Sequence, residues 1–111
     1  MQFVDEYPVL KLARITGPHH NFLSIRFSEK ELTESPVIED IDPQKKEKGL
    51  IKEEVLEQVM FGVALMSSEM NQKYYVEKVE FLSGDTQPVS IYKYLATEIV
   101  RRVKRAKSIK D

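Results

Sequence analysis

Two adjacent histidines, His19 and His20, are the only imidazoles in the chain. Imidazole nitrogens act as general bases and as metal ligands, but a metal site needs three or four ligands that converge on one point. Adjacent side chains on an extended backbone point apart, and the surrounding segment GPHHN offers no carboxylate. We therefore interpret both histidines as solvated residues of a turn at residues 17–21, and expect no metal and no cofactor. A small catalytic or ligand-binding site around this turn is the alternative.

Glu77 is a second residue that could do chemistry. It falls between Tyr75 and Val79 on the apolar face of a strand predicted over residues 74–82. A carboxylate on such a face must be paired, protonated or close to an edge. We interpret Glu77 as an edge-strand residue that reaches water or pairs with a lysine, because inward charges protect sheet edges. A general acid is the alternative, although the sequence offers it no nucleophile or base as a partner.

Cysteine is absent from the chain, which excludes disulfides, thiolate zinc sites and thiol catalysis. No catalytic, metal-binding or nucleotide-binding fingerprint is present either, so the sequence favours a protein that is not an enzyme. The N-terminus lacks a signal-peptide pattern, and the longest apolar run, residues 59–66, is too short to span a bilayer. We expect a cytoplasmic protein.

The C-terminus carries the strongest charge feature of the chain. Residues 1–100 hold 11 basic and 17 acidic residues, a net charge of −6, whereas 6 of the 17 basic residues lie between Arg101 and Lys110. A concentrated field of this kind attracts an acidic partner or an anion. On a helix whose buried stripe includes Leu95 and Ile99, the outward side carries the candidate partner-binding residues Arg101, Arg102, Lys104, Arg105 and Lys107.

Four explanations of this basic stretch are open. The cations could complement the C-terminal end of a helix dipole, or they could pair with the acidic segment 29–42. They could also bind a partner protein or a nucleic acid. We rank nucleic acid last, because the body of the chain is acidic and no aromatic residue follows Tyr94 to stack on bases.

The pattern of apolar residues predicts three strands and two helices. Leu23, Ile25 and Phe27 alternate cleanly in a strand that pairs with residues 9–16 as a hairpin. Residues 29–50 read as a long charged loop, anchored at one point or forming a short edge strand around Val37 and Ile38. The predicted elements are the strands 9–16, 22–28 and 74–82 and the helices 52–71 and about 90–106.

This order, β-β-α-β-α, predicts a single α+β domain over residues 1–111, in which two helices pack on a small mixed sheet. The helix between the second and third strands permits a parallel crossover between them. Residues 104–111 are expected to form a frayed basic tail. A sheet of three strands leaves two open edges, which a second copy of the chain could complete.

The first predicted helix is too apolar for an ordinary surface helix. Its core stripe includes Leu56, Val59, Val63 and Met66, but the run 59–66 wraps nearly the whole circumference. Its outer side therefore faces another layer or another subunit. Gly62 in the middle of the helix indicates a place where another backbone approaches closely.

Together these features predict a small cytoplasmic protein-interaction module. We expect it to be homo-oligomeric and to bind a protein partner through charge-complementary surfaces. A nucleic-acid-associated protein that uses the basic C-terminal helix is the first alternative, and a small enzyme or ligand-binding domain around the histidine turn is the second.

Overall fold

The computed structural model describes residues 2–16, 19–41, 50–85 and 88–110. Of Thr16, His19 and residues 104–110 it describes the backbone alone. The predicted α+β class is confirmed, but the described elements follow the order β-β-β-β-α-β-α, with two strands more than the sequence predicted. The elements are β1 (Gln2–Glu6), β2 (Val9–Thr16), β3 (His19–Ser28), β4 (Val37–Asp40), α1 (Lys52–Met70), β5 (Tyr75–Phe81) and α2 (Ile91–Lys110).

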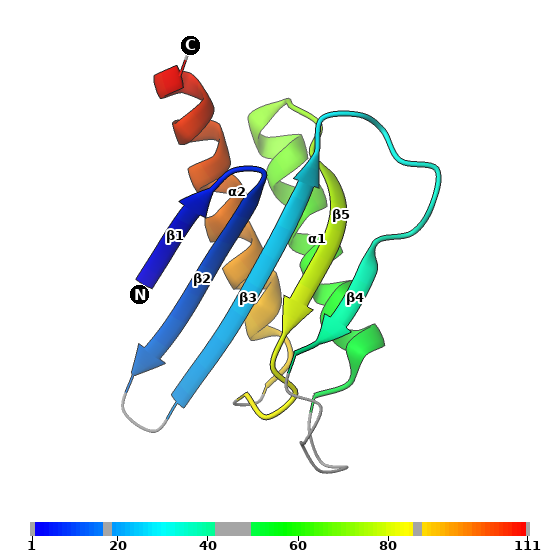
Figure 1. Ribbon diagram of the computed structural model, residues 1–111, viewed down its shortest axis with the longest axis vertical. Coiled ribbons are helices and arrows are strands. Elements are labelled where there is room, and N and C mark those ends of the chain that lie inside the picture. The colour runs from blue at the N-terminus through cyan, green and yellow to red at the C-terminus, as the bar shows by residue number, and fades with distance from the viewer. Residues whose placement is uncertain (1, 17–18, 42–49, 86–87, 111) are drawn as a thin grey trace.

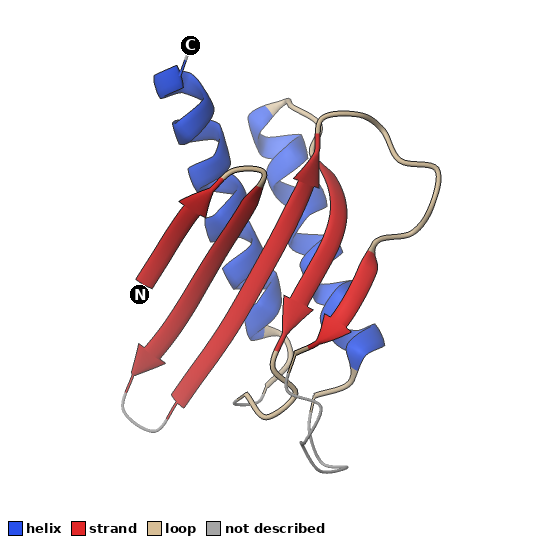
Figure 2. Cartoon of the chain, viewed as in Figure 1, coloured by secondary structure: helices blue, strands red, loops and turns tan. Residues whose placement is uncertain are grey.

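The strands form one mixed sheet in the order β1-β2-β3-β5-β4. Neighbouring strands are antiparallel except for β4 and β5, which are parallel and are connected through α1. The expected parallel crossover between the second and third predicted strands is therefore wrong, since β3 and β5 are antiparallel and the crossover starts from β4. Both helices cover one face of the sheet (Figure 1), and the opposite face carries no helix (Figure 2).

The two additional strands lie at the edges of the sheet. β1 has too few apolar residues for a clear alternation. Its strand conformation depends instead on pairing with β2, from Gln2 opposite Ala13 to Glu6 opposite Val9. β4 is the short edge strand around Val37 and Ile38 that was one of the two possibilities for the 29–50 segment, and Ile38 packs against the core. Part of that segment, residues 42–49, lies outside the described residues.

The histidines are not turn residues, because β3 begins at His19 and pairs His20 with Ile15 of β2. The hairpin turn is therefore shorter than predicted, and its residues 17–18 lie outside the described ranges. His20 therefore lies on a strand, where the hydrogen-bonded ladder fixes its backbone.

A β-bulge changes the face on which Glu77 lies. The register passes from Arg26 opposite Lys78 to Phe27 opposite Val76 and so omits Glu77. Val76 is consequently buried, although the alternation had predicted Tyr75 on the core face. Glu77 is exposed, with its Oε1 3.4 Å from Nε of Arg26, and β5 lies between β3 and β4, although β4 pairs only with its second half. The placement of Tyr75 and Glu77 on the core face is therefore wrong, since an extra residue reverses the alternation, whereas Glu77 reaches water as expected and pairs with an arginine rather than a lysine.

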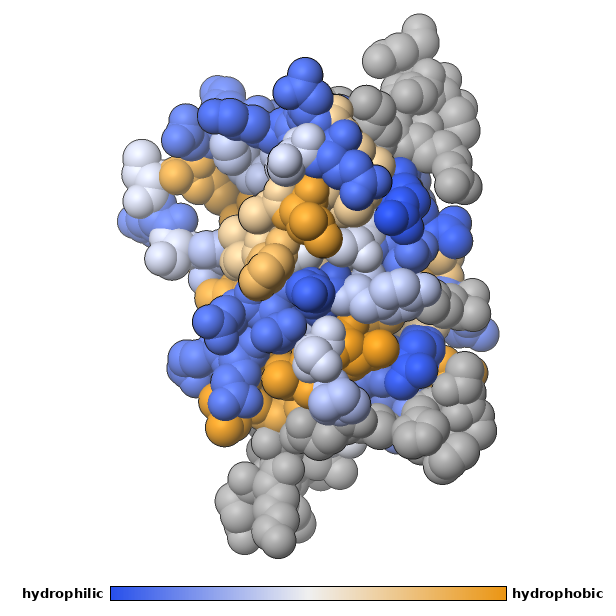
Figure 3. Space-filling model, turned by 180° about the vertical axis from the view of Figure 1, so that it is seen from behind, coloured by the Kyte–Doolittle hydropathy of each residue, from blue (hydrophilic) through white to orange (hydrophobic). Residues whose placement is uncertain are grey.

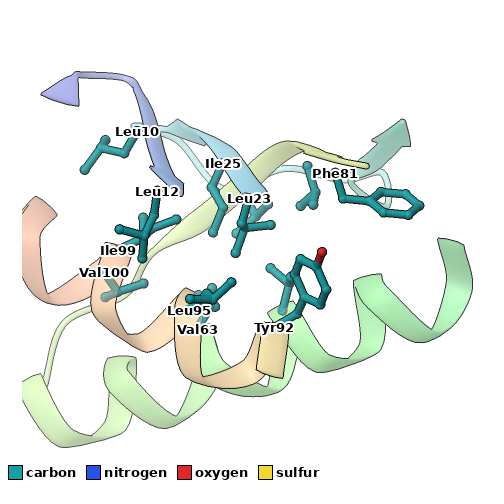
Figure 4. Packing of buried hydrophobic residues seen from close by; sticks show 14 of the residues in the cluster. Leu10, Leu12, Leu23, Ile25, Val63, Phe81, Tyr92, Leu95, Ile99 and Val100 are labelled. Carbon is teal, nitrogen blue, oxygen red and sulfur yellow. The ribbon is translucent and has the colours of Figure 1, made fainter. Parts of the chain in front are cut away.

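The core lies between the sheet and the helices. Leu10 and Leu12 of β2 and Leu23 and Ile25 of β3 extend toward the helices, as Figure 4 shows. The predicted stripe of α2 is confirmed where side chains are described, because its members are all buried: Tyr92, Leu95, Ala96, Ile99 and Val103. The backbone of α2 remains helical to Lys110, beyond the point at which the chain was expected to fray.

The bounds predicted for the first helix agree with α1, which begins at Lys52 and ends at Met70. Val55 rather than Leu56 is fully buried in its first turns, and Gly62 lies against α2 as predicted. In the described part of the chain, no helix combines the length and the apolar character needed to cross a bilayer.

Asn71 ends α1 in the left-handed conformation, with φ 54° and ψ 46°. Asparagine tolerates this conformation better than residues with other β-carbon substituents. We expect Asn71→Ala to lower the free energy of unfolding by about 1 kcal/mol, and Asn71→Gly to leave it unchanged or to raise it. Urea unfolding followed by circular dichroism measures both variants. Equal stability of the alanine and glycine variants would show that this cap does not limit the helix.

Candidate functional site

The carboxylate of Asp85 is the centre of a buried polar cluster at the end of β5. Its side chain is 1% exposed. Oδ2 accepts hydrogen bonds from the backbone N–H of Phe22 at 2.6 Å and from the hydroxyl of Tyr92 at 2.8 Å. Oδ1 lies 3.2 Å from Nδ1 of His20. A carboxylate only accepts hydrogen bonds, so Nδ1 of His20 carries the donated proton.

The cluster continues away from His20 through Tyr92 and Asn21. Burial raises the pKa of the Tyr92 hydroxyl far above its usual value, and the neighbouring charge of Asp85 raises this pKa further. Asn21 is itself buried, and its Oδ1 accepts a hydrogen bond of 3.0 Å from Nη2 of Arg14. The guanidinium Nε of Arg14 is buried and lacks a hydrogen-bond partner among the described residues. Polar groups from β3 and α2 thus meet Asp85 where the sheet joins the helix layer, and Arg14 of β2 contacts Asn21 of this cluster.

This arrangement gives His20 a fixed orientation. The buried carboxylate holds the Nδ1 edge of the imidazole, while 58% of the side chain is exposed. An imidazole held in this way can accept or pass on a proton. The described residues contain no group of three metal-ligating side chains, so their geometry does not form a metal centre. The pairing leaves no local signal in the sequence, because His20 and Asp85 are 65 residues apart.

Of the five predicted partner-binding cations, Arg101 and Arg102 have described side chains, and each contacts a different neighbour. Arg101 forms an ion pair of 2.6 Å with Glu98, and its Nη2 lies 3.9 Å from Sδ of Met66 on α1. Arg102 stacks on Phe3 of β1, with its guanidinium carbon 4.6 Å from the ring centroid. The side chains of the remaining candidates, Lys104, Arg105 and Lys107, lie outside the described residues. Partner binding by this group of five cations stays a prediction.

Among the helix side chains that the structure describes, three large apolar ones are exposed: Phe61 at 56%, Leu65 at 48% and Tyr94 at 47%. Nζ of Lys93 lies 4.8 Å from the ring centroid of Phe61, which links α2 to α1 across this surface. Figure 3 shows the side of the molecule on which the helices lie, with apolar patches between charged side chains. We call this outer side of α1 and α2 the helix surface.

The helix surface combines helices of opposite charge. α1 contains four glutamates and one lysine, a net charge of −3, whereas α2 contains seven basic residues and one glutamate, a net charge of +6. The two helices lie side by side in one layer (Figure 1). The helices run in the same direction, since Gly62 lies beside Lys93 and Met66 beside Arg101. The glutamates in the first turns of α1 therefore lie toward one end of the layer and Arg101 toward the other, with exposed apolar side chains on both helices.

Comparison of the chain with family models, curated proteins and solved structures finds no match. The function is therefore inferred from the chain's own residues.

Proposed function

We propose that this protein is a small interaction module of the cytoplasm that self-associates through its helix surface. The observation that carries the proposal is the combination of Phe61, Leu65 and Tyr94 with oppositely charged helices in one layer. Exposed apolar side chains surrounded by polar ones are typical of protein interfaces. Arginine and tyrosine are also the side chains that contribute most to binding at such surfaces.

The charge of the two helices indicates how two copies meet. In a two-fold dimer the same surface serves both subunits, so any contact of α1 with the partner's α2 occurs twice. Such a contact brings the acidic helix of each copy to the basic helix of the other. The opposite charges favour this arrangement over one that places α2 against α2. The apolar side chains form the buried centre of the interface, and the charges determine how the two subunits are oriented relative to each other.

Substitution of Phe61 tests the apolar centre. Phe61→Glu places a charge in the proposed interface, and we expect the dissociation constant of the dimer to rise by roughly 30-fold or more, the effect of a hot-spot residue. Sedimentation equilibrium at micromolar concentration measures this constant. Ile15→Glu is the matched control, because Ile15 is 64% exposed but lies on β2, on the face without helices. A wild-type chain that stays monomeric, or equal effects of both variants, would contradict the proposal.

Exchange of charges tests the pairing of the helices. We expect Glu54→Lys with Glu57→Lys to be monomeric, and likewise Lys93→Glu with Arg101→Glu, because the four exchanged positions of each double variant then all carry charges of one sign. An equimolar mixture should form heterodimers, since each half then pairs opposite charges. Sedimentation velocity of the two variants, separate and mixed, gives the answer. A mixture that stays monomeric would exclude contact between α1 and the partner's α2.

A further inference from the structure

One edge of β5 is only half covered. β4 pairs with the second half of β5, from Val37 opposite Lys78 to Asp40 opposite Phe81. The connection from β3 to β4 leaves the sheet after Ser28 and returns to it only at Val37, which lies opposite Lys78 in the middle of β5 (Figure 1). On this side, Tyr75–Glu77 have no strand partner in the described part of the chain. Unpaired strand edges of this kind are templates for an added strand.

Two surface hollows flank this half-covered edge. The first lies under the connection, and its lining residues are Leu32, Thr33, Glu34, Ser35, Val37 and Glu77. The second lies beside α1 and is lined in part by Met60, Ala64 and Tyr75. Alternate side chains of an extended peptide point to opposite sides of the strand. A peptide placed along the edge would therefore form hydrogen bonds with the backbone of β5 and place one set of its side chains in each hollow.

The charge around the first hollow indicates the chemistry of the peptide. Glu34 and Glu77 line this hollow, and Glu31 is exposed on the same connection. Glu77 is paired with Arg26, so Glu34 is the acidic side chain of the hollow without a described ion pair. The apolar side chains of Leu32 and Val37 are exposed in the same place. We propose that this edge binds an extended segment of a partner protein, by strand addition in line with β4, in which basic residues alternate with apolar ones.

A second copy of this chain fits the edge less well. Its free edge strand β1 has the sequence QFVDE, and Asp5 and Glu6 would face the glutamates of the connection. Its basic C-terminal segment is helical to Lys110 and is therefore not extended. The length of the gap, three residues, corresponds to about 10 Å of strand. A peptide of about five residues is long enough to fill it.

The probe for a test is an acetylated and amidated peptide, Lys-Val-Lys-Val-Lys, added to the ¹⁵N-labelled full-length protein. We expect chemical-shift changes confined to Leu32–Val37, Tyr75–Glu77 and the α1 residues of the second hollow, Met60 and Ala64, and nuclear Overhauser contacts between the backbones of the peptide and β5. A peptide N-methylated at all five residues lacks main-chain donors except its terminal amide, and one with glutamate in place of lysine reverses the charge. Each should bind at least tenfold more weakly. Equal binding of the N-methylated peptide, shifts confined to the helix surface, or no shifts at millimolar peptide would overturn the proposal.

Variants of the protein complete the test. We expect Glu34→Lys to weaken binding of the lysine peptide about tenfold, whereas Glu6→Lys, on the opposite edge strand β1, should leave it unchanged. Equal effects of the two variants would show that only the net charge matters, and would overturn the assignment of the site. The Phe61→Glu variant should bind the peptide as the wild type does, so failure of strand addition and failure of self-association are distinguishable.

Discussion

Asp85→Ala is expected to lower the free energy of unfolding by about 3 to 5 kcal/mol, since it leaves two buried donors without their acceptor. The donors are the N–H of Phe22 and the hydroxyl of Tyr92, whose side chain is fully buried. Each unsatisfied buried group costs roughly 1 to 3 kcal/mol. The change also releases the turn after β5 from β3. Urea unfolding followed by circular dichroism measures the loss.

Two further variants separate the parts of this cluster. Tyr92→Phe removes a donor together with its need for an acceptor, so we expect a loss of only about 1 to 2 kcal/mol. In the double variant with Asp85→Ala the two losses should not add, because the residues share one hydrogen bond. His20→Ala should cost less than about 1 kcal/mol, because the imidazole is largely exposed. If Asp85→Ala costs no more than His20→Ala, the carboxylate does not hold the cluster together.

The sequence predicted best the elements whose apolar side chains repeat over several turns or strand residues. α1 and α2 have long stripes, and Leu23, Ile25 and Phe27 alternate without interruption, so burial alone determines which side faces the core. β1 and β4 have too few apolar residues for such a signal, because edge strands are ordered by pairing with a neighbour. The bulge at Glu77 is a property of the pairing of two strands, which neither strand shows alone.

The polar cluster around Asp85 could not be predicted either, because it too depends on contacts between segments that are distant in the sequence. Asp85 follows β5 in a Ser-Gly-Asp segment that is typical of a turn, and nothing local indicates that its carboxylate is buried. Its partners come from β3 and α2, and only the topology brings them together. The half-covered edge of β5 likewise depends on where β4 begins. A signal was present in the predicted long loop of residues 29–50, since long connections are often functional.

Gly62→Ala is expected to destabilise the protein by about 1 to 3 kcal/mol, although alanine is the better helix former by about 1 kcal/mol. A β-carbon at position 62 would lie 2.5 Å from the carbonyl oxygen of Lys93 and 3.0 Å from Cβ of Ala96. The first contact is with the backbone of α2, which cannot turn aside as a side chain can. The helices must therefore separate, and the core side chains beneath them lose contact. Thermal and urea unfolding measure the loss of stability.

Two companion variants identify the cause of the loss at Gly62. Ser68→Ala, at an exposed position of α1, should stabilise slightly through helix propensity, so opposite signs at two positions of one helix point to packing. Adding Ala96→Gly to Gly62→Ala removes the 3.0 Å contact but leaves the 2.5 Å contact with the Lys93 carbonyl, and should restore only part of the stability. Full restoration would assign the close approach to the side chain of Ala96 rather than to the backbone of α2. A stable Gly62→Ala variant would instead mean that α1 and α2 separate without cost, and would remove the physical reason for glycine at this position.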